Sequence, residues 1–294
     1  MNLMKYKLLY FLFSTLLILP GLYYLVTSGL KLGIDFTGGA LLEYKVEQTV
    51  GGEQLREVIS KQGIEVGQIT TSGENTYIIR TKPVEQEKLN ELNTKLTEEF
   101  GQVEVRRTEN VGPVIGKELE QKAILATAVA SLAIVLYIAF SFRKVPKPTS
   151  SWRFGAAAIV ALIHDVLMVV GAFAILGRYW GVEIDTLFVT ALLTVIGFSV
   201  HDTIVVFDRI RENLIKNINR KFTEVANISV VQTLGRSLNT SLTVVFVLLT
   251  LLLFGGETIK WFVVALLIGI ISGTYSSIFN ATALLTYWEE KLGH

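Results

Sequence analysis

The 294-residue chain is 51% hydrophobic and 18% charged, and its formal net charge at pH 7 is +1. This composition is too apolar for an ordinary soluble domain and points to a membrane protein. The chain has no cysteine, which excludes disulfide frameworks, thiolate metal sites and cysteine nucleophiles, and its three histidines leave little material for a histidine-rich metal centre.

Six runs with few or no charges are long enough to cross a bilayer with a hydrocarbon core of about 30 Å. They lie at residues 8–30, 123–142, 154–177, 186–207, 237–256 and 261–288. The first run is too long for the core of a signal peptide and is expected to be a retained span. The sequence therefore predicts a polytopic α-helical membrane protein with six transmembrane helices.

Basic residues predict how these spans are oriented. Thirteen Lys and Arg residues fall on one side of the six spans, whereas the short loops of the other side hold only Arg178 and Lys260. We therefore expect both termini and the 208–235 loop in the cytoplasm, and residues 31–120 outside it.

The cytoplasmic loop has two readings. Its apolar residues Ile210, Leu214, Ile215 and Ile218 fall near helical spacing among Arg and Lys. This pattern is typical of a basic amphipathic helix at the membrane surface. It also fits a charged loop that only sets the topology.

Residues 31–120 are expected to form an independent α+β domain between spans one and two. Its predicted strands are 40–47, 64–71, 76–81 and 103–107, and its predicted helices are 52–62 and 84–100. Gly73-Glu74-Asn75 is a hairpin signal between the second and third strands. The order β-α-β-β-α-β is that of a ferredoxin-like domain.

Two of the apolar runs contain a His-Asp pair, His164-Asp165 in the third span and His201-Asp202 in the fourth. A carboxylate in lipid costs at least a few kcal/mol, so it normally faces a bundle interior or a water path and marks a proton or ion route. Asp202 lies about two-thirds of the way along its span and is the leading proton-carrying candidate. The competing reading is that Asp202 only hydrogen-bonds neighbouring helices.

Polar residues extend from Asp202 along two predicted helices. Those near helical spacing are Thr190, Thr194, Gly197 and His201 in span four, and Arg236, Asn239, Thr240 and Thr243 in span five. Such stripes pack another helix closely or line a water file. Arg236 is expected to neutralise a deprotonated Asp202, although a basic residue at a span end also snorkels to the interface.

Asp165 and His164 are neighbours on one predicted helix, so their side chains are expected to point about 100° apart and not to form one relay. One of the two is expected to face span four. Proton carriage and hydrogen bonding for assembly both remain open for this pair. A charged His201 beside Asp202 would share the proton or alter its release.

Small residues mark two further places. In span six, Gly269 and Gly273 with Ser276 or Ser277 and Asn280 form a close-packing stripe, against a partner or span four. After span one, Asp35 and the paired Gly38-Gly39 are expected to shape the turn into the first strand, because glycine tolerates tight-turn backbone angles.

Motifs for enzymatic chemistry are not found in the sequence. The glycines at 112 and 116 precede Lys117-Glu118, where a phosphate-binding loop needs Ser or Thr after Lys. There is no metalloprotease helix motif, nucleophile elbow or nucleic-acid module. We expect no enzyme activity, no cofactor and no nucleic-acid partner.

Several strings resemble one family. Gly-Ile-Asp-Phe-Thr-Gly-Gly at 33–39 and Val-Gly-Pro-Val-Ile-Gly-Lys-Glu at 111–118 resemble signatures of the SecD and SecF proteins. Ala-Leu-Ile-His-Asp-Val at 161–166, Asp-Arg-Ile-Arg-Glu-Asn at 208–213 and Thr-Leu-Gly-Arg-Ser-Leu at 233–238 resemble SecF proteins specifically. His201 departs from that pattern, which usually has Asn before this Asp.

The resemblance implies a subunit of the SecDF complex, related to the resistance-nodulation-division transporters. Such a subunit pairs with SecD in the lipid membrane, associates with the SecYEG channel, and uses protons to help draw unfolded polypeptide out of the channel. Two alternatives remain: a small-molecule or lipid exporter of the same superfamily, and a non-transporting assembly or binding subunit. Neutral substitution at Asp202 separates proton coupling from assembly.

Overall fold

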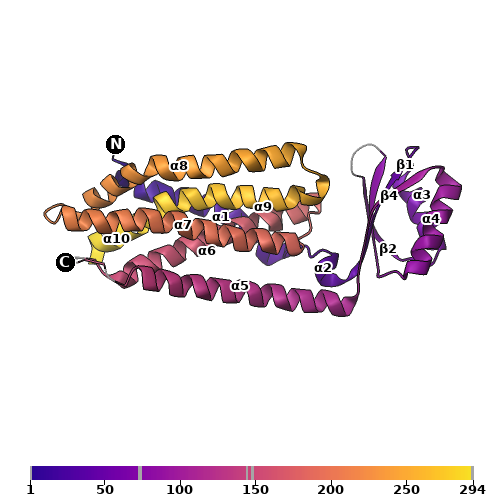
Figure 1. Ribbon diagram of the computed structural model, residues 1–294, viewed down its shortest axis with the longest axis horizontal. Helices are drawn as coiled ribbons and strands as arrows, with labels where there is room; N and C mark the ends of the chain where they lie inside the picture. The colour runs from indigo at the N-terminus through magenta and orange to yellow at the C-terminus, as the bar shows by residue number, and fades with distance from the viewer. Residues whose placement is uncertain (1, 72–74, 144, 147–148, 293–294) are drawn as a thin grey trace. The chain divides into compact units, whose positions relative to one another are not determined.

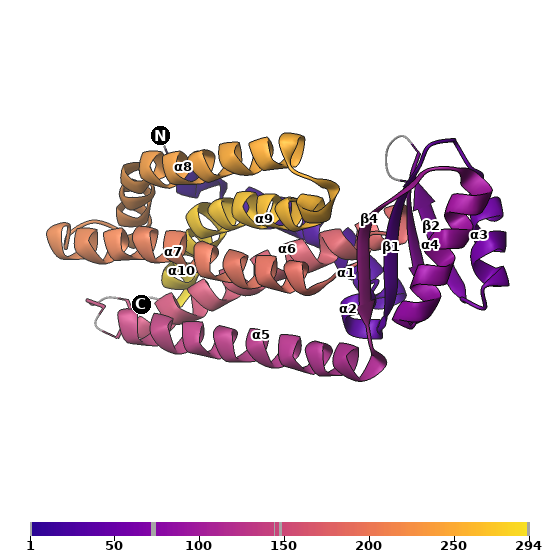
Figure 2. The same ribbon diagram turned by 45° about the vertical axis from the view of Figure 1, so that its right-hand side comes forward.

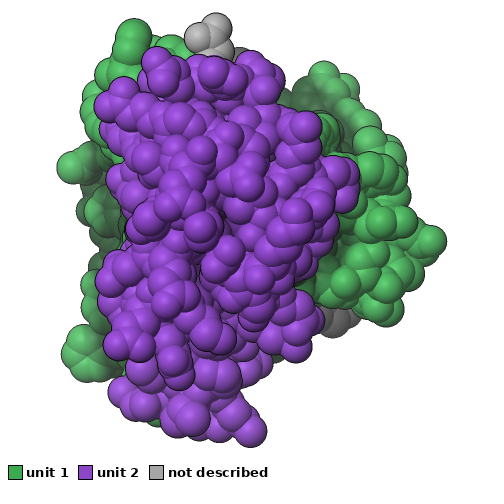
Figure 3. All heavy atoms as spheres, turned by 90° about the vertical axis from the view of Figure 1, so that its right-hand side faces the viewer, with its two compact units in different colours: residues 1–31, 125–294 green, residues 32–124 purple. Residues whose placement is uncertain are grey.

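The computed structural model describes residues 2–71, 75–143, 145–146 and 149–292. The chain forms two compact units, one from Met1–Lys31 with Leu125–His294 and one from Leu32–Ile124 (Figure 3). The predicted turn residues Gly73 and Glu74 lie outside the described residues, as do Lys144 and Lys147 of the basic set.

Within the described residues, six helices are long and apolar enough to cross a membrane (Figure 1). They are Leu3–Ser28, Pro113–Ser141, Ser151–Trp180, Thr186–Lys216, Phe222–Phe254 and Thr258–Lys291. These helices confirm the six predicted spans, and the chain is a multi-pass helical membrane protein. Each helix is longer than its predicted span, because helices continue into the charged flanks that end a hydropathy run.

The helices of the first unit carry the following labels. They are η1 (Leu3–Tyr6), α1 (Lys7–Ser28), α5 (Pro113–Ser141), α6 (Ser151–Trp180), α7 (Thr186–Lys216), α8 (Phe222–Phe254), α9 (Glu257–Tyr275), the π-helical segment η2 (Ser276–Asn280) and α10 (Ala281–Leu292). The sixth span is made of α9, η2 and α10 in sequence. Its most apolar window is 67% buried, the highest share of the six, so this span forms the core of the bundle.

The predicted surface helix in the 208–235 region is wrong. Helix α7 runs on to Lys216 and α8 starts at Phe222, so the segment consists of two helix ends joined by a short connection (Figure 2). The apolar residues Ile210 and Leu214 are buried because the end of α7 packs against the start of α8. Ile215, near the end of α7, and Ile218, in the connection after it, are 61% and 82% exposed, so only two of the four apolar residues join the helix packing.

Helices α1 and α6 cross at a pair of glycines. A Cβ atom added to Gly21 would lie 2.8 Å from the Cα of Gly171, and one added to Gly171 would lie 2.9 Å from the Cα of Gly21. Such distances leave no room for any side chain. Close backbone approach at small residues is a common means of helix association in membranes, where lipid is as apolar as leucine.

Gly171→Ala is therefore expected to lower the free energy of unfolding by about 1–3 kcal/mol, the usual cost of overpacking a filled contact. Gly155→Ala on the same helix is the matched control, because its added Cβ would come no closer than 4.0 Å to Ile138. Denaturant titration of the purified chain in detergent measures both variants. Equal stability of the two would contradict the backbone contact.

The second unit contains a four-stranded antiparallel sheet with strand order β2-β3-β1-β4. Its elements are α2 (Ile34–Thr37), β1 (Gly39–Val46), α3 (Gly52–Lys61), β2 (Val66–Thr71), β3 (Thr76–Thr81), α4 (Gln86–Phe100) and β4 (Val103–Val111). Helices α3 and α4 cover one face of the sheet (Figure 2). From β1 onward the elements follow the order β-α-β-β-α-β, preceded by the short α2.

The core of this unit follows from the sequence periodicity. Leu42 and Tyr44 alternate along β1, and Leu89, Leu92 and Leu96 lie on one face of α4; all five are buried. The Tyr44 hydroxyl donates to Asn93 Oδ1 at 2.6 Å. Burial raises the pKa of Tyr44 to about 12, so this phenol stays a neutral donor at physiological pH.

The paired glycines lie at the entry to β1. Gly38 and Gly39 have φ angles of +72° and +144°, which side-chain-bearing residues rarely adopt. A Cβ on Gly38 would approach Pro113 Cα to 2.9 Å, and one on Gly39 would approach the Thr81 carbonyl oxygen to 2.8 Å. Asp35 lies in the first turn of α2, three residues before Gly38.

Candidate functional site

Asp165 lies at the centre of a buried group of donors that we call the Asp165 cluster. Its carboxylate accepts hydrogen bonds from Ser199 of α7, from Ser276 of η2 at 2.7 Å, from Ser272 of α9 at 3.2 Å, and from His164 Nδ1 at 2.9 Å. Asp165 is 0% exposed. One carboxylate thus joins α6, α7 and the sixth span, and the expectation that one member of the His-Asp pair faces span four is confirmed.

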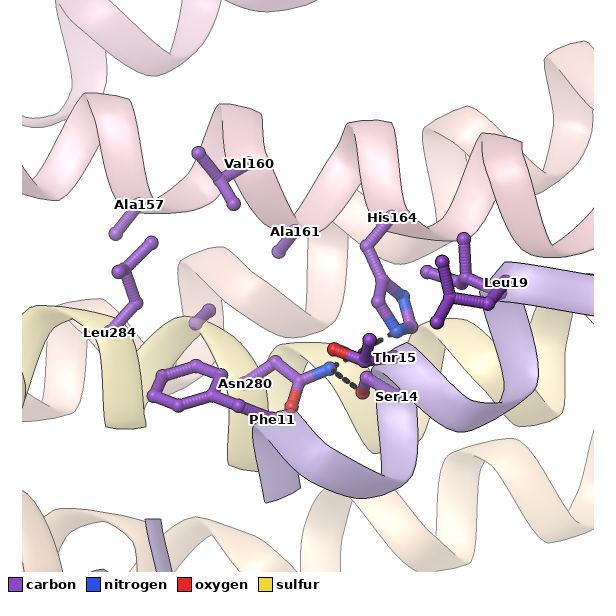
Figure 4. Close-up of a pocket in the computed structure, with 12 residues that line it drawn as sticks. Phe11, Ser14, Thr15, Leu19, Ala157, Val160, Ala161, His164, Asn280 and Leu284 are labelled. Carbon is purple, nitrogen blue, oxygen red and sulfur yellow. Dashed lines mark hydrogen bonds between the residues drawn. The ribbon is translucent and has the colours of Figure 1, made fainter. Parts of the chain in front are cut away.

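His164 contacts Asp165 directly, so the predicted divergence of the two side chains is wrong. The backbone vectors of adjacent residues do diverge, but rotation about the side-chain bonds of His164 brings Nδ1 back to the carboxylate. Because Nδ1 donates there, Nε2 of a neutral ring accepts, and it lies 3.2 Å from Asn280 Nδ2. The same amide nitrogen lies 2.6 Å from Ser14 Oγ on α1 (Figure 4).

Asp202 has a sparser environment. It is 2% exposed on α7, and its Oδ2 atom lies 3.5 Å from the hydroxyl of Thr274 on α9. That hydroxyl also lies 2.6 Å from Ser241 Oγ on α8 and donates to the Ile270 carbonyl at 2.8 Å. Asp202 therefore lies where α7, α8 and α9 meet, with far weaker hydrogen bonding than Asp165.

The polar residues predicted around Asp202 lie on the outside of the chain. We call Thr190, Thr194, Gly197 and His201 the α7 stripe, and Arg236, Asn239, Thr240 and Thr243 the α8 stripe. All eight residues are exposed. The threonine hydroxyls donate to carbonyls of their own helices, which satisfies them in an apolar medium. A Cβ on Gly197 would meet nothing within 4 Å.

The structure does not bring Arg236 to Asp202. Among the described residues no ion pair joins these two groups, because Asp202 is turned into the bundle while Arg236 is exposed on α8. Spacing along each helix indicated which residues share one side of that helix. It did not show that Asp202 and Arg236 lie on different sides of the helix packing.

The glycines of the sixth span make the expected close contacts with span four. A Cβ on Gly269 would overlap the Val195 side chain, and one on Gly273 would lie 3.2 Å from Ser199 Cβ and 3.5 Å from Asp165 Oδ2. Within the described residues, His, Asp and Glu side chains form no group of three or more placed to hold a metal ion.

Comparisons with known proteins follow the same residues. The family described as "Protein export membrane protein SecD/SecF, C-terminal" matches residues 91–291, and the "SecD/SecF GG Motif" family matches residues 23–50, which include Gly38 and Gly39. A "Protein translocase subunit SecF" from Thermobaculum terrenum is 49% identical, covering 99% of this chain and 94% of the relative. Another from Anaerolinea thermophila is 43% identical, covering 98% and 94%.

A solved structure is similar over nearly the whole chain. The crystal structure of SecDF, a translocon-associated membrane protein from Thermus thermophilus, matches with a TM-score of 0.86 and 35% identity. The match covers 99% of this chain but only 39% of the SecDF chain. The chain therefore belongs to the SecF family of protein translocase subunits, within the wider SecD/SecF family of export membrane proteins.

Proposed function

We propose that this chain pairs with a SecD-like partner and couples proton movement through the membrane to late steps of Sec-dependent protein translocation. The observation that carries the proposal is the buried, weakly bonded Asp202 beside two polar stripes left exposed by the rest of the chain. The threonines of these stripes bond to their own helices, but His201, Arg236 and Asn239 are costly to expose to lipid unless another helix covers them. A second helical bundle supplies that cover, and the similar SecDF chain is long enough to contain one.

The physical role of Asp202 follows from the membrane field. A proton crossing 100 mV contributes about 2.3 kcal/mol, which biases a two-state equilibrium roughly fiftyfold. When the buried carboxyl group of Asp202 binds or releases a proton, that energy shifts the equilibrium between two helix arrangements. Arg236 is exposed on α8 and away from Asp202 in this arrangement, so its proposed role as counter-charge for the deprotonated acid belongs to the second helix arrangement, and His201 modulates the exchange.

Asp165 has a different task in this scheme. Four donors occupy its carboxylate, and they come from three spans of the bundle. It holds α6, α7 and the sixth span together, whereas Asp202 has room to gain and lose a proton. In this proposal Asp165 stabilises the packing of the three spans, and Asp202 carries the proton.

The second unit is proposed to be a ferredoxin-like domain outside the cytoplasm, with both termini in the cytoplasm of a bacterial or archaeal-type inner membrane. The β2-β3-β1-β4 order and two helices on one sheet face support this assignment. In domain terms, residues 1–30 form the N-terminus and first span, 31–120 the outer domain and 121–294 the five remaining helices. The partners of the complex are the SecYEG channel and unfolded polypeptide in transit.

Gly197→Leu tests the partner surface. The new side chain has open space within this chain, so the isolated chain should fold normally, while recovery of the SecD-like partner in co-purification should fall about tenfold through overpacking of the interface. Val26→Phe, at a 79% exposed position of α1, is the control and should leave recovery unchanged. Full recovery with Gly197→Leu would place the partner elsewhere.

A further inference from the structure

The last turns of the sixth span join three other helices of the bundle. At the end where α1 begins and α10 ends, Glu289 of α10 forms an ion pair with Arg153 of α6, with 2.9 Å between Oε1 and Nη1 (Figure 1). The neighbouring Glu290 is ion-paired with Lys7 of α1 and accepts a hydrogen bond from the Thr223 hydroxyl of α8 at 2.7 Å. These two adjacent carboxylates, which we call the acid pair, therefore connect α10 to α1, α6 and α8.

Glu289 is buried, which is rare for a glutamate without a charged partner. Its side chain is 3% exposed, and that of Arg153 is 16% exposed. The residues directly before these two, Trp288 and Trp152, also pack together, with ring centroids 5.8 Å apart. Separating the members of a buried ion pair leaves a charge without a partner unless water enters. The contact therefore resists separation of α6 and α10 as long as this end of the bundle stays dry.

Apolar side chains fill the packing between Asp202 and this end of the bundle. Val206 and Ile210 follow Asp202 at four-residue spacing on α7, and both are 0% exposed. Val230 of α8 and Leu285 of α10 are 0% exposed as well. Since Asp202 is itself 2% exposed, this arrangement keeps its carboxyl group away from the water at this end.

The same end contains buried polar atoms that make no hydrogen bond within the described part of the chain. They are Ser237 Oγ of α8, Thr282 Oγ1 of α10, Arg153 Nε and Glu289 Oε1, which lies near Arg153 Nη1 but not in hydrogen-bond geometry. A hydroxyl in a membrane helix ordinarily donates to a carbonyl of its own helix, as that of Thr233 does on α8. Unpaired buried groups raise the free energy of the packing that buries them. Opening this end to water would satisfy them and so offset part of the lost apolar contact.

We propose that the acid pair controls whether water from this end of the bundle reaches Asp202. While its ion pairs are made, the ends of α1, α6, α8 and α10 are held together and Asp202 is closed off. When they are released, the ends of α8 and α10 separate and Ser237 is hydrated. Ser237 is one helical turn from Ser241, whose hydroxyl hydrogen-bonds Asp202, so water at Ser237 is next to the proposed carrier. The purpose of this opening rests on the proposed proton-carrying role of Asp202, because it gives the carrier access to one side of the membrane.

The opening can be measured with a single cysteine, because the sequence has none of its own. Ser237→Cys loses no hydrogen bond of the described residues, and a buried thiol reacts with a membrane-impermeant maleimide only when water reaches it. In lipid nanodiscs, which present both membrane faces to the reagent, this reporter should react slowly. Glu289→Gln combined with Glu290→Gln should raise its rate at least about tenfold, a shift of about 1.4 kcal/mol in the equilibrium between closed and open forms.

Three further variants separate the acid pair from general effects of charge or folding. Glu290→Gln alone leaves the buried ion pair of Glu289 in place and should raise the rate only about threefold. Glu212→Gln is the matched control, because Glu212 is ion-paired with Arg209 within the single helix α7, and it should leave the rate unchanged. A second reporter, Val263→Cys, is at a 0% exposed position of α9 away from this end and should stay unreactive in every background.

Equal rates at the Ser237 reporter with and without the acid pair would overturn the proposal. So would reaction of the Val263 reporter in the acid-pair variants, since that would mean a general loosening of the bundle. The measurement uses neither export nor a proton gradient. Failure of the carrier role of Asp202 would therefore appear only in the export assay, and failure of the acid pair only in the labelling.

Discussion

Asp202→Asn is expected to abolish the gradient-dependent part of protein export while leaving the chain folded and bound to its partner. Asparagine has almost the same shape as aspartate but does not bind and release a proton near neutral pH. The variant keeps a side-chain oxygen for the Thr274 hydroxyl, and that contact is weak at 3.5 Å. Export should fall to the level seen when the proton gradient is collapsed, since the bias of about 2.3 kcal/mol per 100 mV is lost.

The measurement is export of a secreted protein in cells with and without the gradient, after insertion and partner recovery have been checked. Asp208→Asn is the matched control. Asp208 is on the same helix, but its side chain is 44% exposed and ion-paired with Arg211, so its loss should leave export unchanged. Normal export in the Asp202 variant would transfer the carrier role to Asp165 or to a residue of the partner.

The same variant distinguishes the alternative readings of the sequence. If the chain only assembles or binds other subunits, Asp202 is a helix-bonding residue and asparagine replaces it with little effect. A small-molecule or lipid exporter of the same superfamily would lose its own transport instead, with protein export intact. The SecF relatives, which cover nearly the whole chain, favour translocation over export of small solutes.

Hydropathy alone predicted the membrane architecture. Runs of about twenty apolar residues have one stable solution in lipid, a helix with its backbone hydrogen bonds satisfied internally. The acids inside those runs, Asp165 and Asp202, could also be identified from the sequence, because a carboxylate in lipid costs free energy and is therefore rare there. Helix ends were less predictable, as the extension of α7 to Lys216 shows.

The sides of the helices were not predictable from spacing. Both Arg236 and Asp202 were expected near the cytoplasmic ends of their spans. In the structure Arg236 is exposed, whereas Asp202 is buried against α9. Which side faces which neighbour depends on the packing of all six spans, and periodicity gives only the positions that share a side. The divergence expected for His164 and Asp165 failed because it considered backbone directions without side-chain rotation.

The Asp165 cluster had only a partial signal in the sequence. Ser276 was noted beside the span-six glycines, whereas Ser199 and Ser272 are ordinary small residues of apolar runs. They become donors to one carboxylate only when α6, α7 and the sixth span pack together. A useful sequence signal is the coincidence of a buried acid on one span with several hydroxyl residues on others. That coincidence does not say which hydroxyls meet the acid.

Asp165→Ala is expected to destabilise the chain by about 2–3 kcal/mol, from four hydrogen bonds at roughly 0.6 kcal/mol each in a membrane bundle. The loss is larger than for Asp202→Asn because Asp165 has four donors, whereas Asp202 has only the hydroxyls of Thr274 and Ser241, and asparagine keeps an oxygen for them. Denaturant titration of the purified chain in detergent measures both. If Asp165 only carried protons, Asp165→Ala would instead abolish export and leave the stability unchanged.

A double-mutant cycle with Ser276→Ala decides whether the hydrogen bonds carry this stability. Ser276→Ala by itself should cost about 0.6 kcal/mol through its bond to Asp165. In the Asp165→Ala background the same change should cost almost nothing, because the acceptor has gone. Strict additivity of the two losses would mean that the serine stabilises the bundle without the carboxylate. Coupled losses would instead show that Asp165 stabilises the packing of α6, α7 and the sixth span through its hydrogen bonds. Asp165 would then hold these spans in place while Asp202 gains and loses the proton.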